Sequence, residues 1–279
     1  MTALNQAWSP AFLRLIAAGI VVFNGFFPAV WILLTSLKAE VELVQKPITY
    51  WPKNLTLQNY VQAFTDQPLL HFLANSFAVA CLATVASLSV SAFAAYAIAR
   101  LNLTYRKLIL TCIVASSMFP LVTLLVPIFE TMRALNLLNT YTALVLPYVV
   151  LNLPVCTLVL VSFFQSIPKD LENAAMLDGC TRLGALWRVV LPLAAPGVFT
   201  AGILAFVNSW DEFLLALSLN SSAAMRTAPV GITLYQGEFS FPWPIISAAL
   251  IVTIVPVAVL IAVFQERVVG GLTQGGLKA

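Results

Sequence analysis

Charged residues are scarce in this chain of 279 residues: only 9% are Asp, Glu, Lys or Arg, whereas 61% are hydrophobic. Soluble domains carry about 25% charged residues, so the composition excludes an ordinary soluble protein. The mean hydropathy of +0.95 points in the same direction. We therefore interpret the chain as an integral membrane protein.

Residues and motifs that usually perform chemistry are also scarce. The single histidine and four cysteines form no C-x-x-C pair, which predicts neither a disulfide framework nor a metal site. No G-x-x-x-x-G-K-[ST] loop, H-E-x-x-H pair or G-x-S-x-G elbow occurs, so the sequence does not indicate P-loop ATP binding, a zinc protease or an esterase. We predict no catalytic residue, metal or cofactor in this chain itself. Any work that it performs must be driven by a partner.

Six uncharged stretches are long enough to cross a bilayer as helices, which takes roughly 20 apolar residues. They are residues 15–37, 72–99, 108–129, 134–168, 189–210 and 239–265. Alternating segments typical of a membrane barrel are absent, and a lone strand leaves its backbone unsatisfied in lipid. The predicted fold class is an all-α membrane protein with six transmembrane helices, forming a single domain over residues 1–279.

The distribution of Lys and Arg predicts the orientation of these helices, because cytoplasmic loops carry an excess of both. Nine of them fall on the side that holds both termini and the 166–192 segment, and five fall on the other side. We therefore predict that both termini and the 166–192 segment are cytoplasmic. This asymmetry accounts for the net charge of +3, so we infer no nucleic-acid partner.

A polar segment, LENAAMLDGCTRLGALWRVVLP at residues 171–192, separates the fourth and fifth predicted spans. We predict a short helix over about 168–177, with Ser166 as its cap and Pro168 in its first turn. Asp178-Gly179 then forms a turn, and a second helix starts after Thr181. Periodicity alone favours an interfacial connector between the spans. The second helix has an apolar stripe composed of Leu183, Leu186, Trp187 and Val190.

A few polar or amphipathic residues, inside the spans or at the outer end of the fifth, are candidates for lining a solute pathway. Asp211 and Glu212 are the plausible intramembrane acids, which are costly in a bilayer and therefore suggest function. Hydrogen bonding between packed helices is the alternative role for the uncharged members. The candidates are Asn75, Asn152, Asn208, Ser209, Trp210, Asp211 and Glu212.

Several motifs occur together in an order that resembles a known family. Ala174-Ala175-x-x-Asp178-Gly179, followed by Val190-Leu191-Pro192, resembles the EAA loop in membrane subunits of binding-protein-dependent ABC importers. Met118-Phe119-Pro120, LNLLNTYTALVLPY at 135–148 and Trp210-Asp211-Glu212-Phe213 are similar to MalG-like permeases of carbohydrate importers. The resemblance covers nearly the whole chain. It departs from the usual motif at Asn173, where the family commonly has Glu, while Glu172 lies one residue earlier.

The resemblance implies a type I ABC importer permease fold in a bacterial or archaeal cytoplasmic (inner) membrane. It also implies a carbohydrate or similar solute, a second related permease, two subunits that bind ATP and Mg, an extracytoplasmic solute-binding protein and surrounding membrane lipid. Within the EAA coupling loop at about 166–192, the implied ATPase-coupling residues are Glu172, Asn173, Ala174, Ala175, Asp178, Gly179, Leu183 and Trp187. The tail residues implied to reach the ATPase are Gly271, Leu272, Thr273, Gly275 and Gly276.

Two alternatives belong to other functional classes. A gradient-driven secondary carrier or channel would act without an ATPase, and it would be expected to hold a charge pair or ion site inside the membrane, which the spans largely lack. A membrane-embedded hydrolase would need a nucleophile and a base, and no motif for that pair is present.

Overall fold

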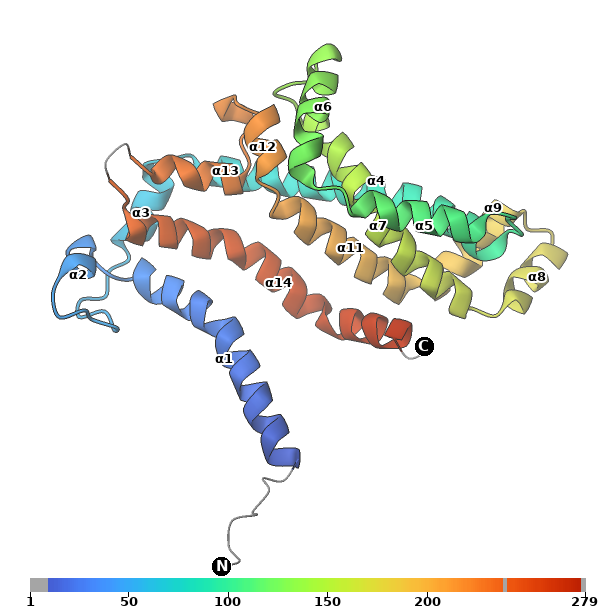
Figure 1. The fold of residues 1–279 in the computed structure, drawn as a ribbon, viewed down its shortest axis with the longest axis horizontal. Helices are drawn as coiled ribbons and strands as arrows, with labels where there is room; N and C mark the ends of the chain where they lie inside the picture. The colour runs from blue at the N-terminus through green and yellow to red at the C-terminus, as the bar shows by residue number, and fades with distance from the viewer. Residues whose placement is uncertain (1–9, 238–239, 277–279) are drawn as a thin grey trace, which may run out of the picture. The chain divides into compact units, whose positions relative to one another are not determined.

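The computed structural model describes residues 10–237 and 240–276, with side chains described for residues 14–237 and 240–264. Every regular element in those ranges is helical, which agrees with the predicted all-α class (Figure 1). The chain divides into two compact units. The smaller unit comprises Met1–Pro68 and Leu234–Ile254, and the larger comprises Leu69–Thr233 and Val255–Ala279.

The described helices include four to six candidate membrane spans. Four single helices are long and apolar enough to cross a membrane: α1 (Pro10–Ser36), α4 (Leu69–Arg100), α7 (Tyr141–Ser166) and α14 (Trp243–Gly276). Two more spans arise only if bent pairs are joined, namely α5 (Arg106–Ser117) with α6 (Leu121–Ala134), and Arg182–Leu193 with α11 (Ala195–Trp210). The six predicted apolar stretches overlap these elements.

The third and fifth predicted spans, residues 108–129 and 189–210, are broken helices rather than straight rods. The α5–α6 pair bends by 91°, and Arg182–Leu193 bends by 81° relative to α11. Pro120 immediately precedes α6, and proline lacks the N–H that would continue the preceding helix. Pro196 lies in the first turn of α11, where its restricted φ suits the start of a new helix.

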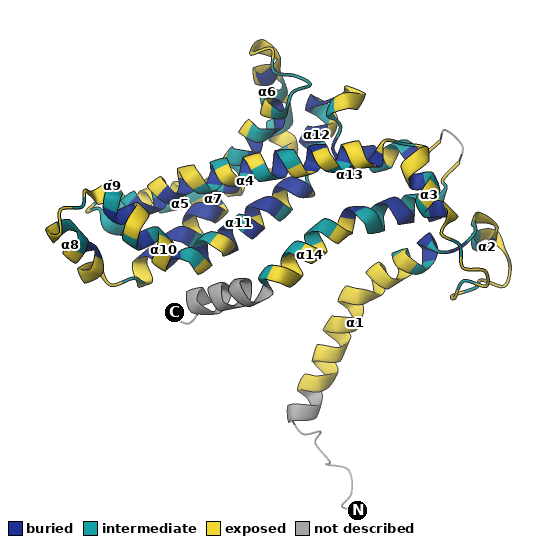
Figure 2. Ribbon diagram, turned by 180° about the vertical axis from the view of Figure 1, so that it is seen from behind, coloured by how far each residue is buried: buried dark blue, intermediate teal, exposed yellow. Residues whose placement is uncertain are grey.

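The larger unit is built around α4, α7 and α11, which pack side by side (Figures 1 and 2). Figure 2 shows that buried residues lie where these helices face one another and that exposed residues lie on their outer faces. At Gly197 the approach of α11 to α7 is so close that an added Cβ would lie 2.3 Å from Cγ of Phe163. Small buried side chains permit such packing between membrane helices. On α4 and α11 they include Ala92, Ala95, Ala99, Ala201 and Ala205.

Short helical elements follow α11, and those within residues 223–232 contact α4. They are α12 (Leu214–Leu219), η2 (Ala223–Met225), α13 (Ala228–Ile232) and η3 (Thr233–Tyr235). Asn75 Nδ2 donates hydrogen bonds to the carbonyl oxygens of Ala224 and Arg226 at 3.0 and 2.9 Å. His71 Nε2 also lies 2.7 Å from the Ala224 carbonyl oxygen. These contacts hold the segment after α11 against the first turns of α4.

The smaller unit contains an ordered lobe in the segment that follows α1. Its helices are α2 (Glu40–Val44) and α3 (Gln58–Thr65). The buried Glu42 carboxylate accepts hydrogen bonds from the backbone N–H groups of Lys53 and Asn54, both at 3.1 Å. Asn59 Nδ2 donates to the Lys38 carbonyl at 2.8 Å. Buried polar groups need such partners, and here they define the path of the lobe.

Candidate functional site

The predicted helical hairpin is present between α7 and α11. It consists of α8 (Lys169–Leu177), α9 (Arg182–Ala185), the π-helical segment η1 (Leu186–Val190) and α10 (Leu191–Leu193). Gly179 adopts a φ of +91°, which favours glycine, and its N–H donates to the Met176 carbonyl at 3.1 Å. Thr181 Oγ1 accepts the N–H of Gly184 at 3.1 Å and so caps α9. The glycine turn and the threonine cap together reverse the chain.

The start of α8 differs from the prediction. Pro168 is the residue before the helix rather than a member of its first turn, and no side chain caps the helix. Ser166 Oγ donates to the Phe163 carbonyl at 2.8 Å, within the last turn of α7. The prediction that Ser166 caps α8 is therefore wrong, because a serine near a helix end can bond back to its own helix instead.

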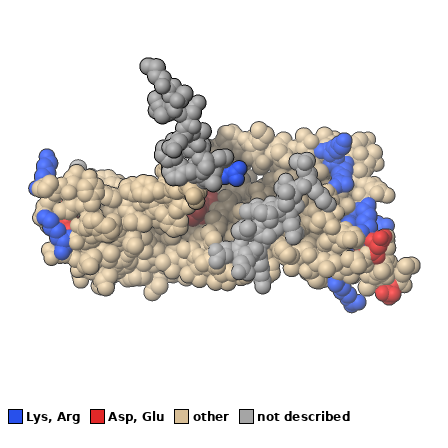
Figure 3. Space-filling view, turned by 90° about the horizontal axis from the view of Figure 1, so that it is seen from below, with Lys and Arg blue, Asp and Glu red and all other residues tan. Residues whose placement is uncertain are grey.

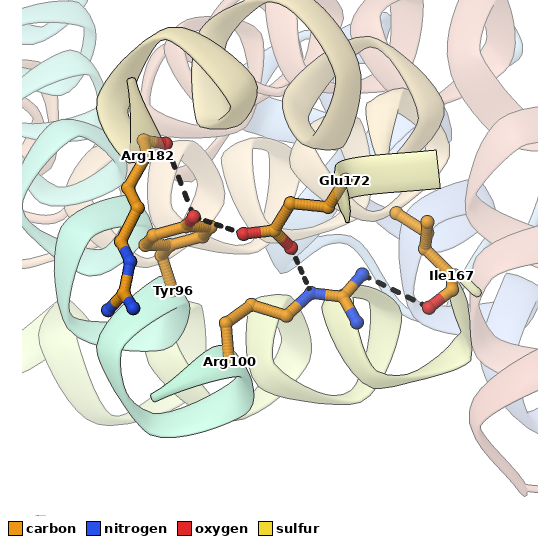
Figure 4. A network of polar contacts seen from close by, with 5 residues as sticks. All are labelled: Tyr96, Arg100, Ile167, Glu172 and Arg182. Atoms are coloured by element: carbon orange, nitrogen blue, oxygen red, sulfur yellow. Dashed lines mark hydrogen bonds and ion pairs between the residues drawn. The ribbon is translucent and has the colours of Figure 1, made fainter. Parts of the chain in front are cut away.

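A buried polar network joins the hairpin to α4 (Figure 4). Glu172 Oε2 lies 3.1 Å from Nε of Arg100, and the Arg100 and Glu172 side chains are only 3% and 9% exposed. The Tyr96 hydroxyl donates to Glu172 Oε1 and lies 3.2 Å from the carbonyl oxygen of Arg182. Arg100 Nη2 donates to the Ile167 carbonyl at 3.0 Å. Helix α4 thus contacts both arms of the hairpin, α8 through the Glu172 carboxylate and α9 through the Arg182 carbonyl.

Glu172 was predicted to contact an ATPase, but its side chain faces inward. Its carboxylate is buried in an ion pair with Arg100 and a hydrogen bond with Tyr96. A residue that contacts an ATPase must instead face outward. Sequence reasoning missed Tyr96 and Arg100 as members of the site. The sequence feature that could have identified this site is the position of Arg100 at the end of a long apolar helix, because a charge buried there requires a partner.

The other predicted coupling residues of α8 and its turn lie mostly on the outside. Asn173, Ala174, Asp178 and Gly179 are exposed, and Ala175 is half-buried. Two leucines that sequence reasoning did not select also face outward. Leu171 is exposed, and Leu177, at the end of α8, is 89% exposed. The hairpin therefore presents polar, small and apolar groups away from the bundle.

The predicted apolar stripe of the second helix divides into two faces. Leu186 and Val190 are fully buried, whereas Leu183 and Trp187 are exposed. A π-helical turn holds more residues than an α-helical turn, so the 3.6-residue spacing does not continue through η1. Leu183 and Trp187 remain available to a partner or to the membrane surface, and Trp187 also makes an edge contact with Phe93 of α4.

The charge distribution sets this end of the larger unit apart. Figure 3 shows Lys, Arg, Asp and Glu side chains gathered where α8 and α9 lie, whereas the flank of the bundle is almost uncharged. An uncharged flank suits a hydrocarbon environment, and a charged end suits the membrane–water boundary.

Three of the predicted pathway residues meet between α7 and α11. Asn152 Nδ2 donates to Ser209 Oγ at 2.9 Å, and Asn208 Nδ2 donates to Asn152 Oδ1 at 2.9 Å. Asn152 and Ser209 are buried, whereas Asn208 is exposed. Two of these side chains thus serve helix packing, and the third extends the cluster to the surface of α11.

The remaining pathway candidates have separate surroundings. Glu212 accepts a hydrogen bond from the Tyr148 hydroxyl at 2.6 Å and from the backbone N–H of Leu215 at 2.8 Å, so it helps to start α12. Trp210 is buried, and Asn75 holds the segment after α11. Asp211 is exposed. Among the candidates, the exposed Asn208 and Asp211 therefore form an outward polar face at the end of α11, Asp211 being the residue that follows the helix.

The predicted ATPase-contacting tail lies at the end of α14. The backbone of Gly271, Leu272, Thr273, Gly275 and Gly276 is helical. Their side-chain surroundings, and all of residues 277–279, lie outside the described residues, so the role of the tail stays a prediction. Within the described part of the chain, no three His, Cys, Asp or Glu residues gather in a way that could hold a metal ion.

Comparisons with known proteins relate this architecture to a family of transport proteins. Residues 87–272 match the family described as "Binding-protein-dependent transport system inner membrane component". The matched region contains the hairpin, the α7–α11 polar cluster and the first two of the predicted tail residues, Gly271 and Leu272.

Two curated relatives align along nearly their whole lengths. The sulfoquinovosyl glycerol transport system permease protein SmoH of Agrobacterium fabrum is 70% identical over 99% of this chain and 96% of its own. The trehalose/maltose transport system permease protein MalG of Thermococcus litoralis is 37% identical over 95% of this chain and 96% of its own. A solved bacterial ABC transporter involved in alginate import has a similar fold. Its TM-score is 0.78 at 20% identity, covering 92% of this chain and 95% of that chain.

Proposed function

Because this chain belongs to the family of inner-membrane components of binding-protein-dependent transport systems, we propose that it is the permease subunit of an ATP-driven sugar importer. The observation that carries this proposal is the hairpin, which is anchored inward through Glu172 and exposes Leu177 and Leu183 outward. The chain itself would form part of the solute pathway. ATP hydrolysis would belong to a partner.

The hairpin is suited to transmit motion from an ATPase. Its outer face offers Asn173, Ala174, Asp178 and Leu183 to a docking surface, while Glu172 attaches its inner face to α4. A displacement of the docked hairpin would then be carried to the α4–α7–α11 bundle through buried contacts. Rigid elements linked by such contacts are a physical route for coupling between distant sites.

The proposed topology has six spans, counting each bent pair as one, with both termini and the hairpin in the cytoplasm. It rests on the excess of Lys and Arg on that side of the predicted spans. Residues 1–279 would form one permease domain in the inner membrane. A second related permease would complete the pathway, two ATP-binding subunits would dock on the hairpins, and a solute-binding protein would deliver the sugar from outside.

The assembly is tested by purifying the tagged chain gently from its native membrane and identifying the proteins that accompany it. We expect a second permease and an ATPase, with two ATPase chains for each tagged chain. The purified complex with its binding protein should take up a solute only when ATP is present. Because of the 70% identity to SmoH, sulfoquinovosyl glycerol is the first solute to assay, with maltose for comparison. Uptake by this chain alone, without ATP, would contradict the proposal.

We propose that the outward polar face at the end of α11, formed by Asn208 and Asp211, borders the solute pathway. In a chain whose native cysteines are replaced by serine, Asn208→Cys should react with a water-soluble maleimide, at a rate that changes when the complex binds ATP. A population shift between two states would produce this change. The control is Leu82→Cys on an exposed apolar face of α4, which should react slowly in both states. If both cysteines react equally slowly, Asn208 does not border water.

A further inference from the structure

A cleft of about 350 Å³ opens where α4, α5, α7 and α8 meet. Its lining includes three cations, Arg100, Arg106 and Lys169, and no carboxylate residue. Gln165 and Ser166 add polar groups from the end of α7. The volume lies within the range of about 300–1,000 Å³ that is usual for sites binding small molecules. The cleft is therefore large enough for a polar headgroup and has the charge to attract an anion.

The positive charge of this cleft is only partly compensated within the chain. Arg100 is paired with Glu172 on one side and donates to the Ile167 carbonyl. Arg106 and Lys169 have no carboxylate within 4 Å among the residues that the structure describes. Two cations thus border the same cleft without an acidic partner in the described part of the chain. A phosphate group would offer each of them a charge-assisted hydrogen bond.

The location of the cleft favours an anionic lipid over a soluble anion. α4 and α7 are long apolar helices that end there, and α5 begins there, so the cleft lies at the boundary of the hydrocarbon region. The proposed topology places this boundary at the cytoplasmic leaflet, where anionic lipids concentrate. Leu108 and Ile109, just beyond Arg106, are exposed apolar residues on α5. They offer an acyl chain a surface beside the cationic cleft.

We propose that this cleft binds the phosphate headgroup of an anionic phospholipid, with Arg106 and Lys169 as its principal cationic contacts. A headgroup held between them would bridge the start of α5 and the start of α8. It would thereby steady the hairpin from the membrane side and leave its outward face free. The inference uses the proposed membrane orientation but is independent of which solute is carried.

The test measures lipid retention by the purified complex in detergent, using native mass spectrometry with added phosphatidylglycerol or phosphatidylcholine. The wild-type complex should retain phosphatidylglycerol preferentially. The double variant Arg106→Gln/Lys169→Gln should lose about 30-fold in that preference, as expected when two basic residues at a membrane surface are neutralised. The matched control is Lys107→Gln, which removes an adjacent exposed charge that does not line the cleft and should leave the preference unchanged.

Each contrary outcome identifies a different occupant. If millimolar inorganic phosphate displaces phosphatidylglycerol completely, the cleft is a site for soluble anions and the lipid proposal is wrong. If the double variant keeps its lipid preference but loses affinity for the ATPase, the two cations contact a protein instead. Thermal unfolding of every variant is compared with that of the wild type, so that a folding defect is not taken for lost binding. None of these readouts requires transport, so they can fail while the proposed function stands.

Discussion

Replacing Glu172 by alanine is expected to detach the hairpin from α4 and to abolish ATP-driven uptake. The change leaves the Arg100 guanidinium buried without its carboxylate partner, and breaking a buried ion pair in this way costs about 3–5 kcal/mol. The lower end applies here because Arg100 also borders the open cleft. A cost of about 3 kcal/mol corresponds to a shift of about 100-fold in the attachment equilibrium. The measurements are uptake and ATPase stimulation in reconstituted complexes.

Asp170→Ala is the matched control for this experiment. It removes an acidic side chain from the same helix, but Asp170 is exposed and has no ion-pair partner among the described residues. Uptake should therefore remain near the wild-type level. Wild-type uptake in Glu172→Ala would show that the buried network is not needed for coupling.

A double replacement separates attachment from coupling. Arg100→Met/Glu172→Leu substitutes an apolar pair for the ion pair, and such replacements are often neutral or stabilising. If the network serves only to hold the hairpin, this variant should recover both thermal stability and uptake. If the polar contacts to Tyr96 and the Ile167 carbonyl are themselves needed during movement, stability should return without uptake.

Replacing Gly179 by valine should uncouple ATP hydrolysis from solute uptake while leaving the chain inserted in the membrane. The φ of +91° is unfavourable for a β-branched residue, and strain of this kind costs of order 1–3 kcal/mol. Apart from Gly179 and its two chain neighbours, no described residue has an atom within 4 Å of a Cβ built at this position, so crowding by other residues does not contribute. The altered turn would reorient α8 relative to α9. The number of solute molecules imported per ATP hydrolysed should fall sharply.

Gly179→Asn provides the graded comparison, because asparagine tolerates left-handed backbone better than valine does. It should retain more of the coupling ratio than Gly179→Val. Both variants should reach the membrane in wild-type amounts, which is checked by quantifying the chain in purified membranes. Full coupling in the valine variant would mean that the turn geometry does not transmit motion.

The sequence predicted the class of protein and the position of the hairpin well, because both depend on residues that are close together in the sequence. Apolar stretches of membrane-spanning length can be read directly from the sequence. Asp178-Gly179 has a strong local preference for a turn, and Thr181 has one for the N-cap of a helix. The prediction of a MalG-like importer permease is confirmed by the family match over residues 87–272 and by the 37% identity to a MalG permease over 95% of this chain. The bends near Pro120 and Pro196 were harder to predict from the sequence, because proline alone does not mark a break. Pro147 and Pro154 lie inside a continuous α7.

What the sequence determined by itself was an all-helical membrane chain interrupted by a polar hairpin. Only the tertiary structure decided which face of that hairpin each residue occupies. Glu172 and Asn173 are neighbours in the sequence, yet one is buried against Arg100 and the other is exposed. Periodicity can rank the faces of a helix, but the partner of a buried charge comes from another part of the chain. The carboxylate of Glu172 faces inward because folding brings α4 beneath α8, and that contact joins residues more than 70 positions apart.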